Sequence, residues 1–136
     1  MSDFVLAARR RWPPLLLMLL FGSLPAARGA SAFDFDVWMR DMDKRSVSVQ
    51  RHLRLREGEP ARADAAVIED LYDRMATWFE RAGQSADAVQ ISRDGQAQAA
   101  GIREAIERQD FDAAHGAALR IARACNDCHD NYKPFP

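Results

Sequence analysis

Four apolar stripes with helical spacing follow one another after about position 33, and this feature restricts the fold more than any other. The clearest stripe lies between positions 63 and 82, where apolar residues recur every three or four positions, as on one face of a helix. Its members are Ile68, Leu71, Tyr72, Met75, Trp78, Phe79 and Ala82. No stretch of useful length alternates apolar and polar residues as a strand would. The sequence therefore predicts an all-α fold.

Short breaks separate the stripes, and each break carries residues that stop or start helices. Gly58 suits the end of the first helix and Pro60 the start of the second, while Ser85 and Asp110 suit the N-caps of the third and fourth. We predict helices over 34–56, 63–82, 86–108 and 111–132. Because short loops make sequential neighbours run in opposite directions, these helices should form an antiparallel four-helix bundle.

The other three stripes predict the remaining core. On the first helix the stripe is Phe35, Trp38, Met42, Ser46, Val49 and Leu53. On the third it is Val89, Ala99, Ile102 and Ile106, and on the fourth Phe111, Ala114, Ala118, Ile121, Ala122, Cys125 and His129. Gly95 lies inside the third helix, where glycine costs about 1 kcal/mol relative to alanine. Either it lets the backbone approach a bulky group, or the helix is marginal.

Residues 1–32 have the layout of a secretory signal peptide. Three arginines at positions 9–11 precede an apolar run from Leu15 to Leu24, and small residues follow from Ala26 to Ala32. The apolar run is about half the 20 residues that a spanning helix needs, which favours a cleaved signal over a membrane anchor. The residues after the arginines fit twin-arginine export poorly, so ordinary secretion is expected.

Cleavage after Ala32 fits the small-x-small rule best and leaves a single mature domain over 33–136, although cleavage after Gly29 or Ala30 is also compatible with it. The chain would then be exported to the periplasm, without stable membrane insertion. The whole chain has a net charge of −1, and the signal carries four arginines and one acidic residue, so the mature domain is more acidic still. This balance argues against a nucleic-acid partner.

Cys125, Cys128 and His129 form the pattern C-x-x-C-H on the last predicted helix. This pattern attaches a c-type haem, because each thiol adds to one vinyl group and the imidazole binds the iron. Positions i, i+3 and i+4 share one helix face, so all three side chains can reach the same group. We therefore predict that Cys125 and Cys128 anchor one covalent haem c and that His129 ligates its iron inside the bundle.

Three other roles for this cysteine pair fit the chain less well. A structural zinc site needs four ligands, and no second Cys/His pair lies at useful spacing. A thioredoxin-like pair belongs beside a βαβ unit, and the sequence predicts no strands. A disulfide across two intervening residues is rare and strained.

The segment Cys125–Lys133 resembles the C-terminal signature of the class II c-type cytochromes, which include cytochromes c-prime and the c-556 type. In that signature the haem motif is followed by an acidic, an aromatic and a basic residue, as Asp130, Tyr132 and Lys133 are here. The place of the motif near the C-terminus is also that of the family. The chain departs from the family near Ile91, where an aromatic residue is common.

The resemblance implies that the sixth ligand decides the function. Met42, on the first helix, is where the family places a methionine ligand, and Met39 is the substitute one turn earlier. Met75 fits a core residue better, since a methionine in an apolar stripe is more often filler. His52 and His115 are predicted to be solvated surface residues.

With Met42 bound, the haem would carry single electrons between periplasmic redox proteins. With an apolar residue there instead, a five-coordinate haem would bind small gases such as nitric oxide, as a cytochrome c-prime does. The sequence shows no distal acid–base pair of the kind that would indicate an enzyme. The resemblance also implies that two copies can pair through their first two helices.

Overall fold

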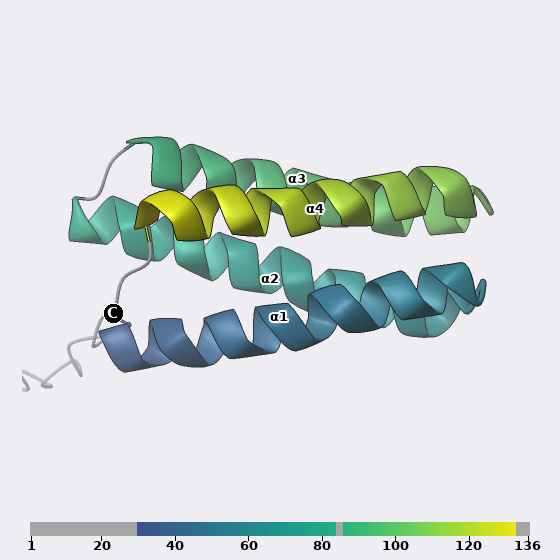
Figure 1. Ribbon diagram of the computed structural model, residues 1–136, viewed down its shortest axis with the longest axis horizontal. Helices are drawn as coiled ribbons and strands as arrows, with labels where there is room; N and C mark the ends of the chain where they lie inside the picture. Colours follow the sequence, from purple (N-terminus) through teal and green to yellow (C-terminus); the bar gives the residue numbers. More distant parts are fainter. Residues whose placement is uncertain (1–29, 84–85, 133–136) are drawn as a thin grey trace, which may run out of the picture.

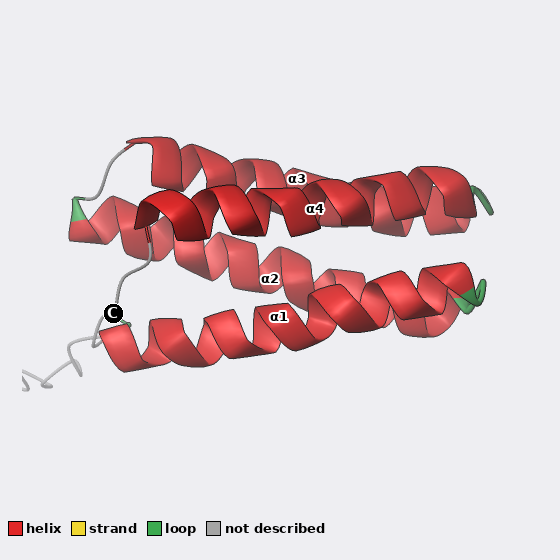
Figure 2. Ribbon diagram, viewed as in Figure 1, coloured by secondary structure: helices red, strands yellow, loops and turns green. Residues whose placement is uncertain are grey.

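The structure, a computed structural model, describes residues 30–83 and 86–132, and this part of the chain is built from helices (Figures 1 and 2). Helix α1 spans Ala32–Arg54, α2 Gly58–Ala82, α3 Ala86–Glu107 and α4 Phe111–Tyr132. The described residues contain no strand. The prediction of an all-α chain with four helices is therefore confirmed.

Each helix packs against two others, so that the four form a closed bundle. The contacts join α1 to α2, α2 to α3, α3 to α4, and α4 back to α1, and the α1–α4 interface is the smallest of them. In Figure 1 the C-terminal ends of α1 and α3 lie at the same end of the bundle as the N-terminal ends of α2 and α4. We call this the loop end. The opposite end, where α1 begins and α4 finishes, is the cavity end.

The large residues of the core come from the predicted stripes, and buried alanines outside the stripes, such as Ala65, Ala88 and Ala117, complete it. Val49, Ile68, Ile102 and Ile121, one from each helix, are at most 1% exposed. Trp38 and Trp78 lie at the edge of the core and are partly buried, whereas Ala82 is exposed and does not belong to it. The helical spacing therefore identified the buried faces, apart from the last residue of the α2 stripe.

The boundary between α1 and α2 differs from the prediction, because α2 begins at Gly58 and not near position 63. Arg56, with φ of 55°, adopts the left-handed conformation after the end of α1, where Gly58 was predicted to end the helix. Pro60 sits in the first turn of α2, where its missing N–H leaves no helical hydrogen bond unmade. A Cβ on Gly58 would lie 3.3 Å from Cγ2 of Ile106, so glycine here lets α2 pack closely against the end of α3.

Two side chains cap helix starts. Ala113 N donates to Asp110 Oδ1 at 2.9 Å, which confirms the predicted cap of α4. At α1, Ser31 accepts from Asp34 N, and Ser31 N donates to the Asp34 carboxylate at 2.7 Å. Ser31 N and Ser31 Oγ both donate to the Asp34 carboxylate, and these two hydrogen bonds lower the pKa of Asp34. Signal cleavage after Ala32 would remove this cap, whereas cleavage after Gly29 would keep it.

The remaining predictions for the chain ends concern residues that the structure does not describe. The N-terminal segment up to Gly29, most of the predicted signal peptide, and the predicted cap Ser85 lie outside the described residues. Within the described ranges, no helix is both long and apolar enough to cross a membrane.

Candidate functional site

A small cavity of about 20 Å³ lies among all four helices toward the cavity end. Its lining residues are Met39, Met42, Tyr72, Met75, Phe79, Ile91, Ser92, Ala124, Cys125 and Cys128. The two cysteines of the C-x-x-C-H motif thus line the same cavity as the predicted ligand Met42. Met42 lies more than 80 positions earlier in the chain, on another helix.

Helix α4 positions the motif. Cys125 and Cys128 are three residues apart on this helix, both partly buried and both free thiols. His129 lies on the same helix and is partly buried, but it is not among the residues that line the cavity. The structure therefore brings together Cys125, Cys128 and Met42 of the four predicted site residues, and places His129 next to them in the chain.

The methionines gather at this cavity. Met42 is fully buried and Met75 is 4% exposed, while Met39 is partly buried against the core. All three methionines of residues 33–136 line the cavity. Met75 is buried, as expected of a core residue, but it also faces the cavity, which its place in the α2 stripe did not indicate.

Tyr72 is a site residue that the sequence presented only as part of the core. Its ring lies against the α3 backbone at Gly95, where a Cβ would fall 2.3 Å from Tyr72 Cζ. Gly95 therefore serves close approach by a bulky group, which was one of its two predicted roles. The Tyr72 hydroxyl lies 3.7 Å from Cys125 Sγ. The available signal was a glycine in the middle of a helix together with a tyrosine in an apolar stripe.

The polar atoms of the cavity are uncharged at neutral pH. Burial raises the pKa of the Cys125 thiol, and the hydrogen bond from Tyr72 opposes that shift only in part. Burial and the neighbouring Cys125 raise the pKa of Cys128. Burial also raises the pKa of Tyr72 far above its usual range, with Cys125 adding to the effect. The cavity is therefore an apolar environment that holds neutral sulfur and hydroxyl groups.

These residues suit a c-type haem in their chemistry. The two cysteine thiols, which could form thioether links to a haem, line the same cavity as the methionine sulfurs of α1 and α2. A methionine sulfur can ligate haem iron. Among the described residues, no group of three or more His, Cys, Asp or Glu could hold a bare metal ion, whereas haem iron takes only one or two side chains.

The volume of the cavity decides whether a haem could enter without movement of the side chains. About 20 Å³ is far below the roughly 300–1,000 Å³ of small-molecule sites. Accommodating a haem therefore requires lining side chains to move apart. Three of them are methionines, whose flexible side chains adapt readily to such changes.

His52 is not the solvated surface residue that was predicted. Its side chain is 17% exposed, because the last turns of α1 pack on the first turns of α2. His52 Nδ1 lies 2.5 Å from Glu57 Oε2, and its Nε2 lies 3.7 Å from Asp64 Oδ2. Asp64 is buried and accepts a hydrogen bond from Arg45 Nη1 at 2.8 Å. We call these four residues the Asp64 cluster. His115 is likewise partly buried.

Comparison with known proteins gives no match: no family model, no curated protein and no solved structure matches this chain.

Proposed function

We propose that this chain is an exported c-type cytochrome of the class II kind, an antiparallel four-helix bundle that carries single electrons between periplasmic redox proteins. The observation that carries the proposal is the meeting of both motif cysteines with Met42 at one apolar cavity. A C-x-x-C-H pattern that arose by chance would not be expected to place both thiols at the same cavity as Met42.

In this proposal Cys125 and Cys128 hold the haem covalently, His129 is the proximal iron ligand and Met42 the distal one. The haem, when bound, supplies the one-electron couple. The chain contributes burial and ligand choice: a thioether ligand and a poorly solvated site both favour the reduced iron and raise the reduction potential. Tyr72, held against Gly95, closes the α2–α3 side of the cavity.

The surface bears on the proposed partners. Among the described residues, the large apolar side chains exposed by more than 40% are Phe33, Val37, Val47, Leu55 and Leu119. Four of these five lie on α1 or directly after it, so this face is where a second copy would pair, as the resemblance implies. The redox partner would have to approach the cavity end, since electron transfer needs the haem to be near.

Absorption spectra of the exported protein test the proposed ligands. We expect a six-coordinate, low-spin haem with the weak far-red band of methionine-bound ferric iron. Met42→Ala should convert this spectrum to a five-coordinate, high-spin one. The matched control is Met75→Ala, which also removes a buried methionine from the cavity wall and should leave the ligation unchanged.

Other spectral outcomes would redirect the proposal. A high-spin spectrum in the unchanged protein would contradict electron transfer and support five-coordinate gas binding instead. Loss of the far-red band in Met39→Ala, with Met42→Ala unaffected, would show that Met39 is the ligand.

Covalent attachment has a separate test. The double substitution of Cys125 and Cys128 by alanine should abolish the haem stain of the denatured protein on a gel, because both thioether links are lost. Either single substitution should leave one link and a residual stain. An unchanged stain in the double variant would refute haem attachment at this motif.

A further inference from the structure

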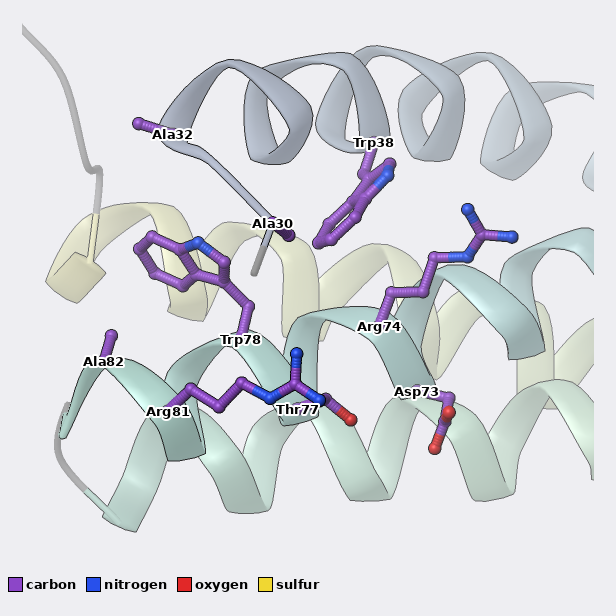
Figure 3. Close-up of a pocket in the computed structure, with 9 residues that line it drawn as sticks. All are labelled: Ala30, Ala32, Trp38, Asp73, Arg74, Thr77, Trp78, Arg81 and Ala82. Atoms are coloured by element: carbon purple, nitrogen blue, oxygen red, sulfur yellow. The ribbon is translucent and has the colours of Figure 1, made fainter. Parts of the chain in front are cut away.

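A second hollow lies on the outer side of α1 and α2, toward the cavity end, and is separate in its lining from the cavity described above. It is a groove of about 570 Å³ (Figure 3). Its lining residues include Trp38, Asp73, Arg74, Thr77, Trp78 and Arg81. This volume falls in the range of roughly 300–1,000 Å³ that small-molecule sites occupy. We refer to it as the tryptophan groove.

Two indole side chains, one from each helix, line the tryptophan groove. Figure 3 shows Trp38 extending from α1 toward α2, and Trp78 rising from α2 near the start of α1. The two indoles are supported from behind by Phe35, whose ring centroid lies 6.4 Å from that of Trp38 and 4.6 Å from that of Trp78. Trp78 also packs edge-on against Phe79, at 5.2 Å. The indoles are therefore held in place before any ligand arrives.

The charge of the groove is positive. Arg74 and Arg81 are seven positions apart on α2, which places them two turns apart on one face. Asp73, the acidic lining residue, is already paired with Arg93 at 2.8 Å. Arg74 pairs with Asp70, but both side chains are more than half exposed, so that bond is weak. Within the described residues no ion pair involves Arg81.

We propose that the tryptophan groove binds a small aromatic carboxylate. The indoles of Trp38 and Trp78 would contact the flat apolar body, since aromatic rings associate in offset or edge-on arrangements. The guanidinium of Arg81 would take the carboxylate, because its planar set of donors matches two carboxylate oxygens. An uncharged aromatic would leave Arg81 without a partner, and an aliphatic anion would leave the indoles without one.

The start of the described chain bears on access to this site. Ala30 and Ala32 line one end of the groove, and in Figure 3 Ala30 lies beside the Trp38 ring. The predicted cleavage after Ala32 would remove both residues and open that end. The groove itself is formed by α1 and α2, and none of its lining residues lines the cavity.

Calorimetric titration of the exported protein with 2-naphthoate tests the proposal, because heat is measured without interference from haem absorption. The neutral analogue 2-naphthalenemethanol should bind about two- to fivefold more weakly, as expected when an exposed ion pair is lost. Arg81→Gln should weaken the binding of 2-naphthoate by about the same factor, and Trp78→Leu should weaken the binding of both compounds.

The matched control is Arg123→Gln, which removes an exposed arginine on α4, away from the groove, and should leave binding unchanged. Arg81 is exposed, so its substitution does not endanger folding even if that of Trp78 does. Equal binding of the acid and the alcohol, or equal binding by the unchanged protein and Arg81→Gln, would overturn the proposal. These measurements record the heat of ligand binding and not haem ligation, so their outcome can be told apart from that of the spectral test of the proposed cytochrome.

Discussion

At the loop end of the bundle the buried carboxylate of Asp64 forms an ion pair with Arg45, whereas the polar side chains that line the cavity at the other end are uncharged. Asp64 is buried between Arg45, at 2.8 Å, and His52, at 3.7 Å. At the cavity end, the Cys125 thiol lies 3.7 Å from the Tyr72 hydroxyl, and sulfur is a poor hydrogen-bonding partner. One apolar core runs through the bundle, but the buried polar groups at its two ends differ in charge.

This difference bears on the proposal that the bundle takes up a haem. Separating α1 from α2 at the loop end would strip a buried carboxylate of its partners, which is strongly unfavourable. At the cavity end, separation would expose methionine and thiol groups but leave no charge unpaired. The loop end can therefore keep the helices in register while the cavity end opens.

The largest effect should come from breaking the Asp64 cluster. Arg45→Met should destabilise the protein by about 2 kcal/mol, less than for a fully buried pair because the Arg45 side chain is 40% exposed. Arg40→Met is the control, since Arg40 and its partner Asp36 are both exposed, and it should cost no more than about 0.5 kcal/mol. Urea unfolding measures both, and equal losses would mean that the Asp64 cluster does not secure the loop end.

A second comparison uses two glycines of α3. Gly95→Ala drives a Cβ into the Tyr72 ring at the cavity end, and should destabilise by about 1–2 kcal/mol, since overpacking outweighs the gain in helix propensity. A Cβ on Gly101 meets nothing within 4 Å. Gly101→Ala should therefore stabilise the protein, by up to about 1 kcal/mol. Thermal unfolding should show shifts of opposite sign, and two stabilised variants would show that the cavity wall yields freely.

The smallest effect is expected for Tyr72→Phe. It removes the hydroxyl near Cys125 and keeps the ring against Gly95, so the loss should be at most about 0.5 kcal/mol. The same unfolding measurements apply. A loss as large as that of Arg45→Met would show that the hydroxyl, and not only the ring, secures the cavity end.

The fold could be predicted because helical periodicity is a local signal. The stripes through Met42, Ile68, Ile102 and Ile121 identified the buried face of every helix. The predicted start of α2 was wrong because Gly58 and Pro60 are each compatible with more than one position relative to a helix end. Glycine can end a helix or admit a close neighbour, and only the contact with Ile106 shows which applies here.

The candidate site was predicted only where a local motif or the family resemblance indicated a residue. Cys125 and Cys128 were found by spacing, and Met42 by resemblance to a family. Tyr72 and the burial of His52 depend on contacts between helices, Tyr72 with Gly95 and His52 with Asp64. Periodicity shows which face of a helix turns inward but does not show which residues of two faces meet.

The contact between Tyr72 and Gly95 also has an evolutionary consequence. Because no side chain at position 95 fits beside a tyrosine at position 72, the two positions are not free to drift independently. A lineage that acquires alanine or a larger residue at position 95 must first, or at the same time, replace the tyrosine with a smaller side chain. Descendants of this chain that keep Tyr72 should therefore also keep Gly95, and the pair would mark this cavity architecture.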